Sequence, residues 1–195
     1  PTRRSSDLRV EWDATAWRDV RFRRRLLWLE EVLIDLSTVE NPHRQQLDWT
    51  LHLAAQALDQ SGTPQPFSLS GPLRHMANAT MAPLNGCQPR HFARDGDTVA
   101  LWLSGDGELW QGVAPDNPAT HDLSYLVIRS HLPQARFVCL WDFANSAPLT
   151  EVQVNHTPVG TQITFWRGER VTHVTLYDAP GKRPDAIFPF AESGT

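Results

Sequence analysis

The chain has 195 residues, of which 41% are hydrophobic, and a formal net charge of −4 at pH 7. This length can bury a sizeable core, the negative charge argues against a nucleic-acid-binding protein, and no apolar run reaches the roughly 20 residues of a membrane-spanning helix. Cys87 and Cys139 stand alone, outside any CxxC pair, and suggest neither a zinc knuckle nor a disulfide framework.

The first eight residues, Pro-Thr-Arg-Arg-Ser-Ser-Asp-Leu, match the translation of a common sequencing adapter codon by codon. We therefore expect residues 1–8 to be an artefact of sequencing. Residues 9–195 are expected to form one β-sandwich domain, which belongs to the C-terminal part of a larger protein.

From residue 22 onward, apolar and polar residues alternate in short segments that Gly, Pro, Asp and Asn interrupt. Alternation with a period of two is typical of antiparallel strands with one buried face. The sequence thus predicts an all-β fold, an antiparallel two-sheet β-sandwich of about ten strands that is incomplete at its N-terminal end. In chain order, the predicted strands are residues 22–29, 32–37, 46–53, 99–103, 108–113, 124–130, 135–143, 151–155, 162–166 and 171–177.

The links between these strands predict how the strands pair. Residues 104–107 and 167–170 contain Gly beside polar residues, which tolerate positive φ, and residues 131–134 contain Pro, so each link is expected to close a hairpin. Glu30 and Glu31 are expected to make a tight connection. Residues 59–90 carry five prolines and are expected to form a long connection or irregular edge without a regular element.

Eight tryptophans give the chain an aromatic content that is suited to stacking on sugar rings. Trp49 and Trp141 fall on predicted core faces and are expected to pack there. Trp102, Trp110 and Trp166 lie out of phase with the aliphatic residues of their strands, so they are candidates to contact a ligand or a second sheet.

His52 is the best local candidate for a chemical role. Asp48 shares its predicted strand face and Asp35 is predicted on the neighbouring strand, and a carboxylate beside an imidazole can orient a catalytic base or a metal ligand. Such a pair is more often a structural hydrogen bond. The sequence contains no HxH, HExxH or CxxC spacing, so no metal site is predicted.

Arginines gather in the predicted strand 22–29, where Arg23 and Arg25 lie on one face. Such a cluster is a candidate to bind an anionic substrate, and its alternative is a solvated strand face.

An Arg-rich strand at 22–29 is followed by a strand that reaches Asp35 and by the segment Leu-Asp-Trp-Thr-Leu-His at 47–52. Strands at 124–129 and 135–138 form a second group. In order and spacing these segments resemble the later part of the C-terminal β-sandwich of the heparinase II/III-like polysaccharide lyases.

The resemblance implies an enzyme that joins an α/α-toroid domain to a β-sandwich and cleaves uronic-acid-containing anionic glycans, such as heparan sulfate or alginate, by β-elimination. It also implies catalytic Asn or His and Tyr residues in the toroid, and a divalent metal, zinc or calcium, held upstream by HxH, Asp and His. The implied location is periplasmic or secreted.

None of that catalytic constellation maps onto this chain. We therefore expect no cofactor in this segment and no lyase activity from it alone. The expected partners are an anionic polysaccharide or oligosaccharide and the toroid domain, with no nucleic acid and no membrane span. The alternative function is a non-catalytic carbohydrate-binding or structural β-sandwich module of a glycan-degrading enzyme.

Overall fold

The structure is a computed structural model that describes residues 8–15, 19–29, 31–65, 71–116, 120–144, 147–178 and 188–190. Residues 1–7 of the predicted adapter-derived segment lie outside this range, and Leu8 begins the first strand. The adapter origin and the domain bounds stay predictions.

Three antiparallel sheets make up the fold. Sheet A contains, in spatial order, β1 (Leu8–Thr15), β2 (Arg21–Leu29), β3 (Val32–Glu40), β12 (Gln134–Asp142), β9 (Asp97–Gly105), β8 (Gln88–Arg94) and β5 (Gln56–Ala57). Sheet B contains β4 (Leu47–Leu53), β11 (Asp122–Ser130), β10 (Glu108–Pro115), β7 (Ala77–Pro83) and β6 (Thr63–Pro64). Sheet C contains β13 (Glu151–Thr157), β14 (Gly160–Arg167), β15 (Arg170–Tyr177) and β16 (Phe188–Phe190), and a short 3-10 helix, η2 (Gly71–His75), precedes β7.

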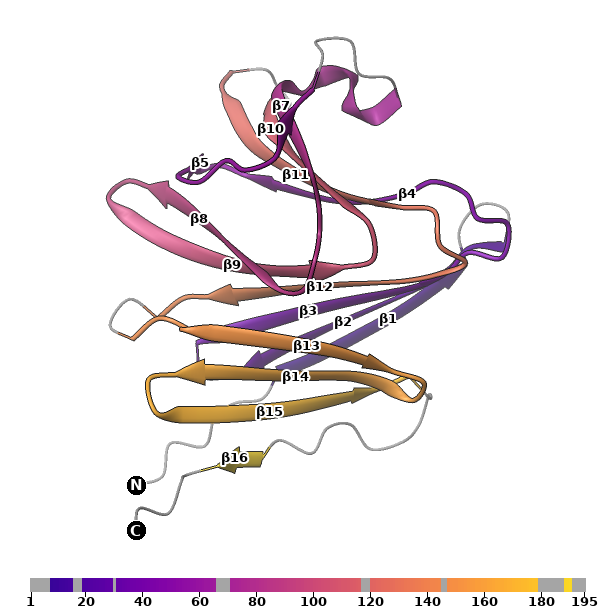
Figure 1. The fold of residues 1–195 in the computed structure, drawn as a ribbon, viewed down its shortest axis with the longest axis vertical. Coiled ribbons are helices and arrows are strands. Elements are labelled where there is room, and N and C mark those ends of the chain that lie inside the picture. The colour runs from indigo at the N-terminus through magenta and orange to yellow at the C-terminus, as the bar shows by residue number, and fades with distance from the viewer. Residues whose placement is uncertain are drawn as a thin grey trace.

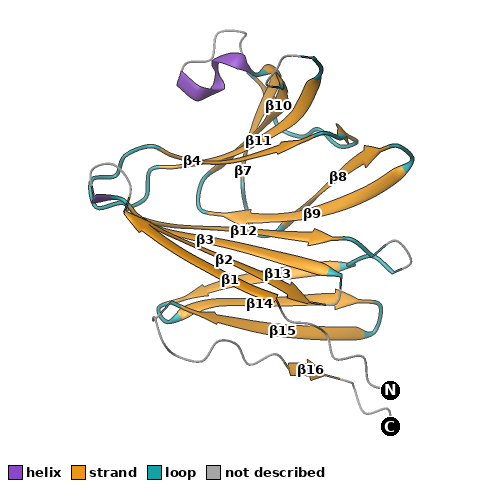
Figure 2. Ribbon diagram, turned by 180° about the vertical axis from the view of Figure 1, so that it is seen from behind, coloured by secondary structure: helices purple, strands orange, loops and turns teal. Residues whose placement is uncertain are grey.

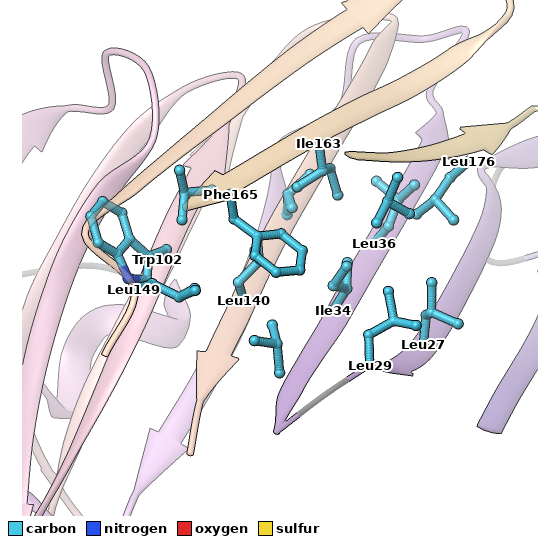
Figure 3. Close-up of a cluster of buried hydrophobic side chains, with 14 residues drawn as sticks. Leu27, Leu29, Ile34, Leu36, Trp102, Leu140, Leu149, Ile163, Phe165 and Leu176 are labelled. Atoms are coloured by element: carbon cyan, nitrogen blue, oxygen red, sulfur yellow. The ribbon is translucent and has the colours of Figure 1, made fainter. Parts of the chain in front are cut away.

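The sheets form three layers, with sheet A between sheet B and sheet C (Figures 1 and 2). One buried apolar cluster lies between sheets A and C, where Ile34 and Leu140 meet Ile163 and Phe165 (Figure 3). A second cluster lies between sheets A and B and includes Phe137. Burial of apolar surface between the layers is the main force that holds them together.

The prediction of an antiparallel all-β sandwich is confirmed, and the structure adds a third sheet to the two that were expected. The extra layer explains why both faces of β3 are buried. Ile34 and Leu36 pack toward sheet C, while Asp35 and Ser37 on the opposite face are also buried. A strand covered on both sides needs partners for its polar side chains, and Arg24 supplies one for Asp35.

Two predicted hairpins are wrong. Residues 104–107 join β9 of sheet A to β10 of sheet B, and residues 131–133 join β11 of sheet B to β12 of sheet A. The strands on either side of each link pair with other strands instead of with each other. β9 pairs with β8 and β12, and β10 pairs with β7 and β11. β11 also pairs with β4, and β12 also pairs with β3.

Buried hydrogen bonds fix these crossings. The side chain of Asn41, on the link from β3 to β4, donates to the carbonyls of Gln45 and Leu132, and its backbone N donates to Pro133 O over 2.7 Å. The link from β11 to β12 is thereby tied to the link from β3 to β4. At the link from β9 to β10, the Asp106 carboxylate accepts a hydrogen bond from Arg136 N.

The third predicted hairpin is confirmed, since β14 and β15 pair across residues 167–170 with Gly168 at φ +60°. β2 and β3 pair across the expected tight connection, where Glu31 has φ +68°; Glu30 lies outside the described residues.

All ten predicted strands are present, and the described residues contain six more: β1, β5, β6, β7, β8 and β16. The expectation for residues 59–90 is wrong in part, because β6, η2, β7 and the start of β8 lie there. Pro83 ends β7, and Pro89 sits near the start of β8, so both prolines occupy strand ends where the loss of one N–H is tolerated.

Candidate functional site

The outer face of sheet B brings together several of the polar and aromatic residues that the sequence singled out. Alternate residues of β4, from Leu47 to Leu53, pack inward against the cluster shared with sheet A, so the intervening side chains point away from it. We call the outward set the His52 face; it consists of Asp48, Thr50 and His52 of β4, Tyr125 and Arg129 of β11, and Trp110 of β10. Strand register places these residues in adjacent rows, with His52 opposite Tyr125, Asp48 opposite Arg129, and Trp110 opposite Val127.

His52 lies against Tyr125, with ring centroids 3.9 Å apart and an angle of 30° between the rings. Partial burial lowers the pKa of His52, and the nearby Asp116 opposes this shift. Partial burial, together with the charge of Asp48, raises the pKa of Tyr125. Both side chains are therefore neutral at pH 7.

Asp48 and Arg129 form a bidentate ion pair in the next row. The Nε and Nη2 atoms of Arg129 donate to the two carboxylate oxygens of Asp48 over 2.8 and 2.9 Å. The guanidinium carbon also lies 5.6 Å from the ring centroid of Trp110, within the range of a cation–π contact. Asp48 thus positions Arg129 rather than His52, and no hydrogen bond joins Asp48 to His52 among the described residues.

The segment around η2 covers part of the outer face of sheet B. Leu73, Met76 and Ala79 pack with Val127, and the half-buried Trp110 and Tyr125 lie against this cluster. A Cβ at Gly112 would approach the terminal methyl of Met76 to 3.1 Å and Ala77 O to 2.8 Å, so the absence of a side chain there allows the segment to lie close. His52 and Thr50 stay exposed on the β4 side.

The predicted neighbourhood of His52 is wrong in one respect. Asp35 lies on β3 of sheet A, whereas His52 lies on β4 of sheet B. Both carboxylate oxygens of Asp35 accept hydrogen bonds from Arg24, over 2.9 and 2.6 Å. Consecutive strands were assumed to be neighbours in one sheet, and the crossing between β3 and β4 breaks that assumption.

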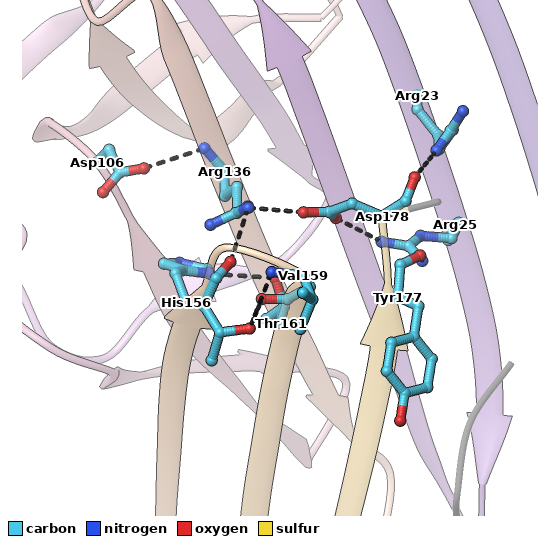
Figure 4. A network of polar contacts seen from close by, with 11 residues as sticks. Arg23, Arg25, Asp106, Arg136, His156, Val159, Thr161, Tyr177 and Asp178 are labelled. Atoms are coloured by element: carbon cyan, nitrogen blue, oxygen red, sulfur yellow. Dashed lines mark hydrogen bonds and ion pairs between the residues drawn. The ribbon is translucent and has the colours of Figure 1, made fainter. Parts of the chain in front are cut away.

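Arg23 and Arg25 belong to a different place, the contact between sheets A and C (Figure 4). Arg25 is only 3% exposed and donates to Tyr177 O over 2.6 Å, and Arg23 donates to Asp178 O over 2.5 Å. Asp178 also accepts a hydrogen bond from Arg136 over 2.6 Å. In this network the two arginines tie β2 to the end of β15, and substrate binding by them stays a prediction.

The two other candidate tryptophans do not belong to the His52 face. Trp102, 9% exposed, packs in the cluster between sheets A and C and so makes a second-sheet contact. Trp166 is half-buried in β14, between Glu151 and Val171 in the register of sheet C. Trp49 and Trp141 pack against the cluster between sheets A and B, as predicted, and Cys139 is fully buried there.

Next to the arginine network, His156 gives a prediction for pH dependence. Its Nδ1 lies 3.1 Å from Thr161 Oγ1, its buried Nε2 has no hydrogen-bond partner among the described residues, and burial lowers its pKa from the usual 6.5. The folded state favours the neutral His156 ring. The stability that this preference provides is fully present above about pH 6.5, and it is lost as the pH falls through the pKa of His156 in the folded state.

We therefore expect an NMR titration to place the pKa of His156 below 6.5, and we expect His156→Gln to flatten the decrease in unfolding free energy between pH 7 and pH 5. The exposed His43→Gln is the control. An unchanged pH dependence in His156→Gln would contradict this assignment.

Sequence reasoning missed Tyr125 and Arg129 as members of the His52 face. Tyr125 contacts the η2 cluster and also lies against His52. The missing information was the pairing of β11 with β4, two strands separated by about 70 residues of chain.

No protein-family model matches the chain, and no curated protein matches it significantly. In the part of the chain that the structure describes, no group of three or more His, Cys, Asp or Glu side chains is arranged to hold a metal ion. Within the same residues, no helix has the length and hydrophobicity that crossing a bilayer requires.

Proposed function

We propose that this chain is the β-sandwich portion of a polysaccharide lyase for uronic-acid-containing anionic glycans, and that it binds the glycan along the His52 face. The observation that carries the proposal is the contact of Arg129 with the Trp110 ring, beside the paired rings of His52 and Tyr125. Aromatic surface and a cationic hydrogen-bond donor occur together on one strand face, as an acidic sugar requires.

The chemistry of each group supports an acidic sugar as the ligand. The apolar face of a pyranose ring packs on an aromatic side chain, and a guanidinium recognises a carboxylate with paired hydrogen bonds. Asp48 engages Nε and Nη2 of Arg129, and no described residue hydrogen-bonds its Nη1. Arg129 can therefore keep its ion pair while it donates to a uronate.

A hollow of about 510 Å³ extends the His52 face at one end. Arg129 borders this hollow together with Glu108 and His131. A chain of several sugars that crosses Trp110 can continue past Arg129 into this space, so the proposal fits an oligosaccharide better than a monosaccharide.

The resemblance places the catalytic base and acid in the toroid, so we propose binding rather than catalysis for this segment alone. β-Elimination needs a base that removes the C5 proton and an acid that protonates the departing O4. We therefore expect no unsaturated, ultraviolet-absorbing product when the chain is incubated with alginate or heparan sulfate. Formation of that product would contradict the expectation.

Binding is tested by calorimetric titration with alginate- and heparan-derived oligosaccharides. We expect Trp110→Ala to weaken binding about ten-fold, equivalent to about 1.4 kcal/mol. Trp166→Ala is the matched control, since it removes a half-buried tryptophan from sheet C, and should leave the affinity unchanged. Equal affinities in the wild type and Trp110→Ala would refute the His52 face as the site.

The second candidate function, a non-catalytic carbohydrate-binding module, predicts the same binding result. The two differ in what precedes this segment in its gene. A helical repeat region with Asn or His and Tyr, followed by HxH, supports the lyase, whereas an unrelated catalytic domain supports the binding module.

A further inference from the structure

We infer that Trp28, Trp141 and Phe143 form a second sugar-binding platform, which stacks on the apolar faces of uncharged pyranose rings. This inference rests on the proposed glycan-binding function and adds a site with a different ligand chemistry. The platform lies on sheet A and shares no residue with the His52 face.

The three rings form a continuous row. The Trp28 and Phe143 ring centroids are 5.4 Å apart with 26° between the ring planes, and those of Trp141 and Phe143 are 6.2 Å apart with only 5° between them. Trp28 is 36% exposed and Phe143 44% exposed, and they are the aromatic members of the exposed large hydrophobic residues in the described chain. Aromatic surface is thus available to a ligand.

Strand register explains the position of the row. Leu27 and Leu29 point into the cluster between sheets A and C, so Trp28 points to the opposite face of the sheet. Trp28 and Trp141 both pair with Leu33, from either side of β3. Trp141 packs partly against the cluster shared with sheet B, while Trp28 is exposed.

The platform is held in place by the backbone around Phe143. Phe143 N donates to Glu31 O over 3.0 Å, and the next amide, Ala144 N, donates to the buried carboxylate of Asp142. These bonds fix the residue that follows β12. Rings that are already ordered lose little conformational entropy when a ligand binds.

Charged side chains border the apolar row. Glu31 is exposed beside Phe143, and Arg24, four residues before Trp28 on the same face of β2, is 40% exposed and paired with Asp35. A pyranose presents an apolar C–H face and a rim of hydroxyl groups, so it matches a narrow aromatic row with charged hydrogen-bonding groups nearby. Because the charge of Arg24 is paired with Asp35 and Glu31 is an exposed anion, the row favours uncharged sugar faces over acidic ones.

The test uses the neutral probe cellohexaose and follows tryptophan fluorescence and calorimetric heat. We expect the wild type to bind this probe, Phe143→Ala and Trp28→Ala to weaken binding at least ten-fold, and Trp110→Ala to leave it unchanged. Leu58→Ala is the control for removal of an exposed apolar side chain. Circular dichroism should show that all variants are folded.

Absence of cellohexaose binding by the wild type, or equal binding by Phe143→Ala, would overturn the platform. So would a concentration-dependent dimer that Phe143→Ala abolishes, because the row would then be a protein interface. The two probes test the His52 face and the platform independently. Failure of oligouronate binding with intact cellohexaose binding removes the His52 face alone, and the reverse result removes the platform alone.

Discussion

Replacing Asp142 with alanine is expected to lower the free energy of unfolding by about 3–5 kcal/mol, because it leaves a partly buried guanidinium and two backbone amides without their acceptor. The Asp142 side chain is 1% exposed. It accepts from Leu149 N over 2.6 Å, from Ala144 N over 3.2 Å, and from Arg167 Nη2 over 2.8 Å. One carboxylate thus ties the end of sheet A to β14 of sheet C.

Urea denaturation followed by tryptophan fluorescence measures this effect. Asp142→Asn keeps an acceptor oxygen and loses the charge, so it should fall between Asp142→Ala and the wild type. The control is Glu40→Gln, which removes one partner of an ion pair with Arg21 whose side chains are 73% and 63% exposed, and should change stability by less than about 0.5 kcal/mol. A loss below about 1 kcal/mol in Asp142→Ala would refute the role of this carboxylate.

Replacing Phe137 with alanine is expected to cost about 3–5 kcal/mol, through lost burial and the cavity that remains. Phe137 is 2% exposed and lies in the cluster between sheets A and B. Its ring occupies the space over the adjacent strand, since a Cβ at Gly105 would lie 3.2 Å from Phe137 Cδ1. Few neighbours can move to refill that space.

Thermal and urea unfolding report this loss, and Phe137→Leu should recover part of it. Val159→Ala, at a side chain that is 63% exposed, is the control and should be nearly neutral. If Phe137→Ala and Val159→Ala unfold at the same urea concentration, the cluster between sheets A and B contributes less than its burial indicates.

The strands were predictable because their signal is local. In β4 the apolar residues recur at every second position, and the same holds for the inward residues of β15. Of the six strands that were not predicted, several lack such a signal. β5 and β6 have only two residues each, and β7, Ala-Asn-Ala-Thr-Met-Ala-Pro, has no alternation of large apolar residues.

The candidate site was only partly visible in the sequence. His52, Asp48 and Trp110 were singled out and do share one face. Their partners were not, because Arg129 reaches Asp48 through the pairing of β11 with β4. The aromatic platform was missed for a similar reason: Phe143 and Trp28 meet only because β2 and β12 flank β3.

By itself the sequence determined the fold class, the positions of ten strands and which side of each of these strands is apolar, because these depend on residues a few positions apart. The tertiary structure decided which sheet each strand joins. The link at 104–107 is compatible with a hairpin or a crossing between layers, and the choice depends on burial of Leu101 and Leu103 against Leu126 and Ile128. Pairings between distant segments cannot be read from local periodicity, and these pairings created both the His52 face and the platform.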